Sequence, residues 1–352
     1  MKPPYAIPDM TTIRAIPWNG YHVVSTFSGG GGSSLGYRMA GYRVIWANEF
    51  IPAAQETYRA NFPDTILDPR DIRTVRGQDI LDACGLRAGD VHLLDGSPPC
   101  TCFSRAGRQH KSWNRTVAYS DMRQRVDDLF FEYLRLVRDV QPWVCVAENV
   151  AGLVIGVSKG YFKMIMREFQ NAGYRVEARI LDAQWLGVPQ VRRRVIFIGV
   201  RSDLAVTPAF PIPLPYRYTV RDALSWIRYV RASGQPCAWR SADLPAPTVT
   251  AMDATLSPTG YLSGGGWVEA EISDRSVTDG RESRPRERRK FSIAELRRIF
   301  SFPDDYVLTG TTTQQWERLG RSVPPRMMYH IAATIRDHVL DVISASACAA
   351  CG

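Results

Sequence analysis

Short apolar runs alternate with stretches of helical spacing over the first two hundred residues of this chain. The apolar runs, rich in β-branched residues, predict strands at 22–27, 42–47, 91–95, 144–147 and 195–200. Apolar positions three and four apart predict helices at 33–40, 52–61, 129–140, 161–171 and 327–343. Strands that alternate with helices pack as a mostly parallel sheet covered on both faces. The expected fold class is therefore a doubly wound α/β fold.

This rhythm breaks after Arg201, where four prolines fall between 208 and 215 and are followed by irregular sequence with three glycines at 264–266. We expect two domains: a large one from 1–200 and 306–352, and a smaller irregular one from 201–305.

A run of four glycines, Gly29 to Gly32, follows the first strand and precedes a helix. Glycines at such a turn let backbone amides approach a ligand closely. The second strand ends at Glu49, where a carboxylate can accept both hydroxyls of a ribose. A plain tight turn is the alternative, since the third glycine of a dinucleotide motif and the lysine of a P-loop are both missing. Together these features favour a nucleoside site, to which Asp71-Ile72 would add an adenine contact unless that pair is only a helix cap.

A cysteine, Cys100, follows the third predicted strand on a turn stiffened by Pro98 and Pro99. A thiol at a strand's carboxyl end can face a cleft as a nucleophile, although a free cysteine is more commonly a small buried hydrophobe.

Six short motifs in this order resemble those of the DNA cytosine-5 methyltransferase family. They are Phe27-x-Gly29-x-Gly31-Gly32, Pro99-Cys100-x-x-Phe103-Ser104, Glu148-Asn149-Val150, Gln190-x-Arg192-x-Arg194, Arg298 to Asp304, and Gly320-x-Ser322-Val323-Pro324. Each is weak alone, but together they span 27 to 324. The resemblance implies a Rossmann-like methyltransferase fold, S-adenosylmethionine as cofactor, and methylation of cytosine C5 in double-stranded DNA.

The resemblance also implies roles for individual residues. Cys100 would add to C6 of the base, Glu148 would act at N3, and Arg192 or Arg194 would bind O2. The expected cofactor-binding residues are Phe27, Gly29, Gly31, Gly32, Glu49, Phe50, Asp71, Ile72, Pro99, Leu129, Arg321 and Ser322. The expected DNA-binding residues are Ser104, Arg105, Arg108, Lys111, Gln190, Arg286 and Arg288. Without the resemblance, Glu148 would be read as a surface carboxylate and the arginines as a solvated basic turn.

Two positions depart from the family pattern, and the first is Thr101, where the family usually has Gln. Arg321 stands where the family has Asn beside the cofactor's methionine end. It can bind the cofactor's ordinary carboxylate, point to solvent, or select carboxy-S-adenosylmethionine, in which case the product would be a carboxymethylated cytosine.

The composition of the chain indicates which kinds of partner the protein binds. The chain has 352 residues and a net charge of +9, which favours a polyanionic partner such as DNA. Seven unevenly spaced cysteines predict a reducing, cytoplasmic location, and the lack of a long apolar run predicts no membrane span. The resemblance implies a nucleoid-associated protein of a bacterium or phage, and no metal site is expected. A monomer and a cognate restriction endonuclease are further expectations. Other functions left open are an RNA cytosine methyltransferase and a non-catalytic DNA-binding homologue; a thiol hydrolase is disfavoured because no histidine is evidently paired with Cys100.

Overall fold

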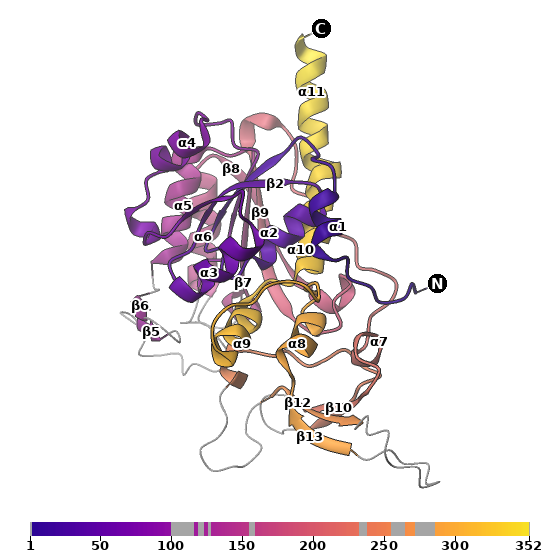
Figure 1. Ribbon diagram of the computed structural model, residues 1–352. Helices are drawn as coiled ribbons and strands as arrows, with labels where there is room; N and C mark the ends of the chain where they lie inside the picture. Colours follow the sequence, from indigo (N-terminus) through magenta and orange to yellow (C-terminus); the bar gives the residue numbers. More distant parts are fainter. Residues whose placement is uncertain are drawn as a thin grey trace.

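The computed structural model describes residues 2–99, 116–118, 123–125, 128–154, 159–231, 238–254, 265–271 and 286–351. Its centre is a seven-stranded sheet of order β3-β2-β1-β4-β7-β9-β8 (Figure 1). These strands are β1 His22–Thr26, β2 Arg43–Asn48, β3 Ile66–Asp68, β4 Leu93–Gly96, β7 Val144–Val150, β8 Tyr174–Asp182 and β9 Arg193–Arg201. The first five are parallel to one another, whereas β9 runs antiparallel to both β7 and β8. The mostly parallel α/β fold expected from the sequence is confirmed.

Helices cover both faces of this sheet, because its central strands are apolar on both sides. One face packs against α4 Gly77–Cys84, α5 Leu129–Val140 and α6 Lys159–Asn171. The other face packs against α2 Gly32–Met39 and α10 Pro325–Ile335. In α5 the buried residues recur three and four apart, which places one continuous stripe on the sheet. The strand β3 and the helix α4 have no counterpart among the expected elements, and neither does β8.

The segment 201–305 is only partly irregular. Its proline-rich beginning has no regular element before α7 Val220–Ala223. A separate antiparallel sheet of order β11-β10-β12-β13 follows. Its strands are β10 Ile227–Arg231, β11 Trp239–Ser241, β12 Trp267–Glu271 and β13 Arg286–Lys290. The expectation of irregular structure therefore holds for the proline-rich stretch and not for the strands.

The remaining elements join the two sheets or lie at their edges. They are α1 Met10–Ala15, α3 Pro52–Asn61, α8 Ile293–Ile299, α9 Thr312–Arg321, α11 Asp341–Cys351 and the small hairpin of β5 Thr116–Ala118 with β6 Arg123–Arg125. One hydrophobic cluster contains Leu35 of α2, Val268 of β12, Leu296 of α8 and Trp316 of α9. This shared core packs the small sheet against α8 and α9 and, through Leu35, against α2, which covers the large sheet (lower half of Figure 1). No helix among the described residues is both long and apolar enough to cross a membrane.

Candidate active site

The carboxyl end of β7 brings together two of the predicted catalytic side chains. Strand β9 runs antiparallel beside it, so Val150 pairs with Arg194 and Glu148 with Ile196. The Nε of Arg194 lies 2.7 Å from Oε1 of Glu148, and both side chains are nearly buried. A guanidinium this close binds the carboxyl group directly and fixes its orientation.

The neighbouring residue on β7 ties this strand to the turn that carries the predicted nucleophile. Asn149 is buried, and its Nδ2 donates to the carbonyl of Pro98 at 3.2 Å. Pro99 follows on the same turn and is partly buried. Cys100 itself lies outside the described residues. The turn that leads to it is thus fixed to the same strand that holds Glu148.

The two arginines of the Gln190-x-Arg192-x-Arg194 motif have different surroundings. Arg192 is fully buried, donates to the carbonyls of Val249 (3.3 Å) and Gly320 (2.9 Å), and lies over the ring of Phe300. Burial lowers the pKa of Arg192 well below its ordinary value. Arg192 therefore links segments far apart in the chain, whereas Arg194 contacts the predicted catalytic carboxylate.

The glycine loop is held by Glu49 at the end of β2. Its Oε2 accepts from the amide of Gly29 at 2.6 Å and its Oε1 from the amide of Ile51 at 2.7 Å. Both carboxylate oxygens are therefore engaged by backbone amides. Phe50, which lies between Glu49 and Ile51 in the sequence, is partly buried.

The glycines of this loop serve two different purposes. A Cβ at Gly29 would meet nothing within 4 Å, so the backbone there borders open space in which a ligand fits. A Cβ at Gly31 would lie 2.4 Å from Cε2 of Phe62, and one at Gly32 would lie 2.3 Å from the carbonyl of Val323. Glycine is required at 31 and 32 by packing against neighbouring segments, a reason that the sequence analysis missed. The open space at Gly29 and the buried Glu49 beside it fit a nucleoside cofactor.

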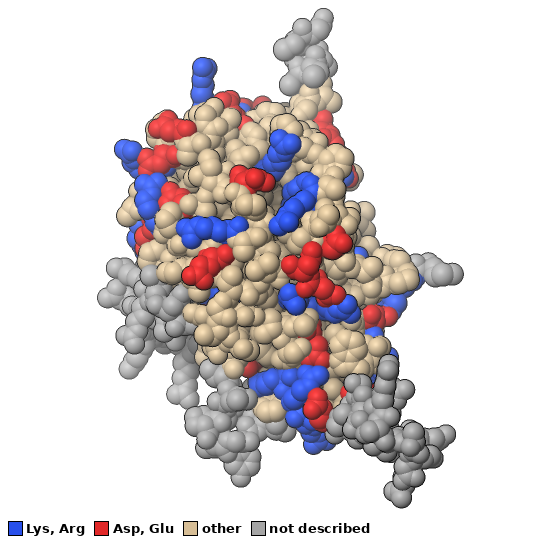
Figure 2. All heavy atoms as spheres, in the orientation of Figure 1, with Lys and Arg blue, Asp and Glu red and all other residues tan. Residues whose placement is uncertain are grey.

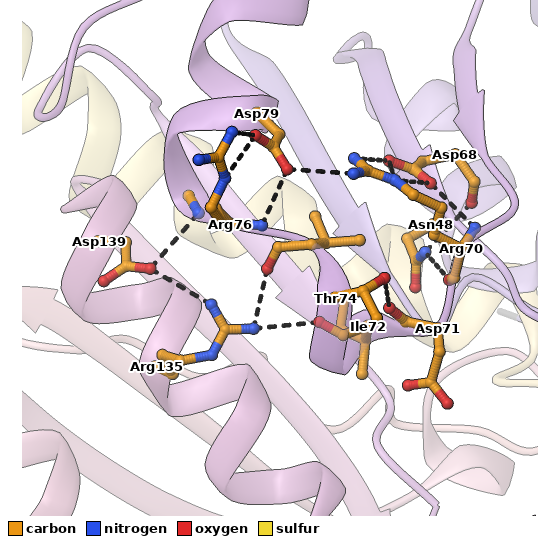
Figure 3. A network of polar contacts seen from close by, with 12 residues as sticks. Asn48, Asp68, Arg70, Asp71, Ile72, Thr74, Arg76, Asp79, Arg135 and Asp139 are labelled. Atoms are coloured by element: carbon orange, nitrogen blue, oxygen red, sulfur yellow. Dashed lines mark hydrogen bonds and ion pairs between the residues drawn. The ribbon is translucent and has the colours of Figure 1, made fainter.

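The segment after β3 is clamped from two sides (Figure 3). Asn48 Nδ2 donates to the carbonyls of Asp68 and Arg70, and Arg135 of α5 donates to those of Ile72 and Val75. These contacts fix the short turn on which Asp71 and Ile72 lie.

The side chains of this region face in different directions. Asp71 caps the turn through the amide of Arg73 and pairs with its guanidinium at 3.0 Å. Ile72 and Leu129 are both buried in the core beneath the sheet. Of these three predicted cofactor contacts, Asp71 alone has an appreciably exposed side chain.

The last motif packs directly on the glycine loop. A Cβ at Gly32 would lie 3.2 Å from Cβ of Ser322, whose hydroxyl donates to the carbonyl of Leu319. The guanidinium of Arg321 pairs with Glu317, one turn earlier on α9, at 2.8 Å. The structure therefore brings Ser322 to the loop and holds Arg321 with a carboxylate of its own helix.

The predicted DNA contacts are only partly described. Ser104, Arg105, Arg108 and Lys111 lie outside the described residues, as does the side chain of Arg286. Gln190 is fully buried, and its side-chain amide forms no hydrogen bond within the described part of the chain. Arg288 on β13 pairs with Glu269 of β12 at 3.0 Å and lies over the ring of Trp239. Its charge is thus already offset within the small sheet.

One buried acid beside this site was missed by the sequence analysis. Asp95 is the penultimate residue of β4 and is 1% exposed. The only signal in the sequence is an acidic residue that closes an otherwise apolar strand, a pattern that the sequence analysis treated merely as the strand's end.

The fold and this arrangement at the strand ends define the class of protein, and comparisons with known proteins agree with it. The C-5 cytosine-specific DNA methylase family matches residues 21–229 and 249–337. The chain is 31% identical over 335 residues to the Type II methyltransferase M1.HphI of Haemophilus parahaemolyticus, covering 89% of this chain and 86% of that protein. It is 27% identical over 348 residues to the Type II methyltransferase M.MthTI of Methanothermobacter thermautotrophicus, covering 92% and 99%.

Solved structures share the fold at lower identity. A putative DNA modification methyltransferase encoded within an Escherichia coli prophage has a TM-score of 0.63 at 19% identity, covering 91% of this chain and all of that one. A DNMT2 mutant of Spodoptera frugiperda has a TM-score of 0.62 at 17% identity, covering 92% and 100%. This chain belongs to the C-5 cytosine-specific DNA methylase family. Membership implies S-adenosylmethionine as the cofactor and DNA as the substrate.

Proposed function

We propose that this protein transfers a methyl group to C5 of a cytosine flipped out of duplex DNA, through a covalent bond between the sulfur of Cys100 and C6 of the base. The observation that carries this proposal is the Glu148–Arg194 pair, next to the turn that leads to Cys100. The same strand end thus offers a carboxyl group, a guanidinium and the approach to a thiol, which are the groups that this chemistry needs.

In the proposed reaction, the thiolate of Cys100 adds to C6 while Glu148 holds a proton at N3 and Arg194 donates to O2. The electron pair released to C5 then forms the new carbon–carbon bond. The methyl group would come from bound S-adenosylmethionine, whose sulfonium makes S-adenosylhomocysteine a neutral leaving group. Transfer of the C5 proton to water, with return of the N3 proton to Glu148, then expels the thiolate and restores the aromatic base. Arg194, rather than Arg192, is proposed at O2 because Arg192 is enclosed by Val249, Gly320 and Phe300.

We propose ordinary S-adenosylmethionine as the donor. The ion pair between Arg321 and Glu317 supports this choice over the carboxylated cofactor. A guanidinium that already has a carboxylate partner gains less from a second one, and its charge repels the sulfonium less.

We also propose that residues 201–305 form the target-recognition domain, with 1–200 and 306–352 as the catalytic domain. The separate sheet β11-β10-β12-β13 supports this division. The family match is interrupted at 230–248, within that sheet, which is where members with different target sequences would be expected to differ. The Type II names of the relatives support a role in restriction–modification with a partner endonuclease.

Trapping on a modified base tests the proposed chemistry. The target sequence is first mapped by bisulfite sequencing of plasmid DNA from cells that express the protein. In the presence of S-adenosylmethionine, a duplex with 5-fluorocytosine at the target position should then form an adduct that survives denaturation, because fluorine replaces the C5 proton whose loss after methyl transfer releases the thiolate. Cys100→Ser should form none, whereas the control Cys84→Ser, a partly buried cysteine of α4, should form it normally. An adduct with Cys100→Ser would overturn the assignment of the nucleophile.

A further inference from the structure

Asp95 is a buried acid for which the proposed chemistry has no use. It lies on β4 between Ser25 of β1 and Val146 of β7, its partners in register. Its carboxylate accepts from Tyr37 Oη at 3.1 Å and from Ser25 Oγ at 3.3 Å. Both of these partners are hydroxyl groups. Among the described residues, no arginine or lysine contacts the carboxylate of Asp95. A buried acid held without a cation is costly, which suggests a specific task.

The hydrogen bonds of Asp95 lead into the glycine loop. The hydroxyl of Ser28 lies 3.1 Å from both the carbonyl oxygen and the Oγ of Ser25, and Thr26 Oγ1 donates to the backbone carbonyl of Asp95 at 2.9 Å. Phe27, which lies between Thr26 and Ser28 in the sequence, has a φ of 53°, an unfavourable backbone conformation for a residue with a side chain of this size. Such strain persists where the surroundings fix it from several sides, as these hydroxyls do on both sides of Phe27.

The surroundings of Asp95 also connect it to the catalytic strand. Asp95 and Glu148 point to the same face of the sheet, since Val146, two residues before Glu148, pairs with Asp95. The other titratable groups near Asp95 among the described residues are Tyr37 of α2, Tyr58 of α3 and Tyr133 of α5. Burial, with a contribution from the charge of Asp95, raises the pKa of each, so they are neutral, and Glu148 is itself paired with Arg194. Burial, followed by the repulsion of Glu148, raises the pKa of Asp95 to about 7.

We propose that Asp95 is a positioning residue for the cofactor: its ionised carboxylate, through Ser25 and Tyr37, holds the strained segment Ser25–Ser28 in the shape that binds the nucleoside. This inference rests on the proposed function, because it takes the glycine loop as the cofactor site. The carboxylate accepts two hydroxyls at once, whereas the protonated acid must use one oxygen as a donor. Cofactor affinity therefore falls as the pH decreases through neutrality.

Calorimetric titration of S-adenosylhomocysteine into the full-length protein between pH 6 and 8.5 tests this. The native protein should bind more tightly at the upper end of that range. Asp95→Asn should bind about tenfold more weakly at pH 8, as expected for the loss of one hydrogen bond to a charged group, and its affinity should not vary over the range. The control Asp341→Asn removes a similar tyrosine–carboxylate contact, with Tyr21 at 2.7 Å, away from the loop, and should retain the native profile.

An Asp95→Asn protein that is folded and binds with native affinity and native pH dependence would overturn the inference, leaving the proposed function intact. No binding by the native protein at any pH would instead contradict the proposed function. If Asp95→Asn does not fold, Tyr37→Phe and Ser28→Ala decide the question, since each removes one hydroxyl and leaves the acid. Both should bind about threefold more weakly at pH 8, and unchanged affinity in both would overturn the inference.

Discussion

The charged side chains of the two sheets differ in how they are paired. In the large sheet, the acid Asp95 is buried among hydroxyls, and Glu148 meets one guanidinium at the strand ends. In the small sheet, basic side chains are common but are paired: Arg288 with Glu269, and Arg289 with Glu287 and Glu295. A positive patch is visible over this region at the bottom of Figure 2, with acidic side chains beside it. The number of arginines in a sequence therefore does not give the positive charge that remains available to bind a polyanion.

Because of this difference, we expect the two sheets to have separate roles. A singly paired group at a strand end, such as Glu148, suits chemistry at a reacting base, whereas the buried Asp95 suits the positioning of the glycine loop. Paired groups on a small antiparallel sheet hold a surface in shape, so that contacts to DNA depend on geometry more than on net charge. The following predictions test this separation, from the largest expected effect to the smallest.

Exchanging residues 201–305 for the corresponding segment of a relative with a different target should change which cytosines are methylated. We expect transfer of the target sequence, because the small sheet lies within this segment. Bisulfite sequencing of plasmid DNA reads the outcome directly. An active chimera that kept the original target would place recognition in the large sheet. The shared core at Leu296 and Trp316 means that the graft must keep these contacts to fold.

Glu148→Gln should lower the single-turnover rate of methyl transfer by about two to four orders of magnitude, the range for a positioned acid–base group. Its shape is retained, but it can no longer hold a proton for N3. The matched control is Glu177→Gln, which breaks an exposed glutamate–arginine pair with Arg179 on β8 and should leave the rate unchanged. Rapid-quench measurement with bound DNA separates this step from binding, and a near-native rate would exclude the role.

The two arginines of the motif should respond differently to replacement by methionine. Arg194→Met should reduce the single-turnover rate by about a hundredfold or more while the protein remains folded, since it removes the partner of Glu148 at the site. Arg192→Met should instead lower the free energy of unfolding by about 2–3 kcal/mol, because the carbonyls of Val249 and Gly320 lose their buried donor. Denaturant titration and the rate assay, applied to both variants, would contradict this account if the effects were reversed.

Acid should weaken the large sheet through a buried histidine pair. His22 and His92 lie at the amino-terminal ends of β1 and β4, with their Nδ1 atoms 2.9 Å apart, so one must be neutral and accept. Burial, followed by the charge of His22, lowers the pKa of His92 to about 4. At His92 the unfolded chain therefore binds more protons than the folded chain between pH 6.5 and 4, and the stability that this group contributes is lost as the pH falls through this window. Asp95, whose pKa is raised to about 7, contributes with the opposite sign as the pH falls below 7.

His92→Gln removes this contribution and leaves that of Asp95, so stability measured by thermal unfolding should fall less steeply with acid in the variant than in the native protein. A profile that is the same in the native protein and in this variant would show that the pair does not control acid stability.

Five of the seven strands of the large sheet could be predicted from the sequence, because each of these five lies in a short, mostly apolar run. The strands 91–95 and 144–147 were expected within a few residues of their observed bounds. β8 could not be predicted in the same way, because as an edge strand it has an irregular burial pattern and an exposed isoleucine, Ile180. The small sheet was missed because its strands are short and rich in arginine and glutamate, which form cross-strand ion pairs that no apolar periodicity reveals.

The candidate site was predictable where a motif fixes both the residue and its strand, as for Glu148 and Arg194. The distinction between Arg192 and Arg194 could not be predicted, since it depends on contacts with Val249 and Gly320, which are far away in the sequence. The reason for glycine at 31 and 32 depends likewise on the distant Phe62 and Val323. Asp95 gave no signal because its partners come from three separate elements, β1, β7 and α2.

The identity of the modified nucleoside tests the central claim most directly. Purified protein is incubated with unmethylated duplex DNA and S-adenosylmethionine labelled in the methyl group, and the DNA is digested to nucleosides for chromatography and mass spectrometry. This account predicts label in 5-methyldeoxycytidine, with none in the Cys100→Ser variant. Label in N4-methyldeoxycytidine, which has the same mass and is separated by retention time, or in N6-methyldeoxyadenosine, would contradict it.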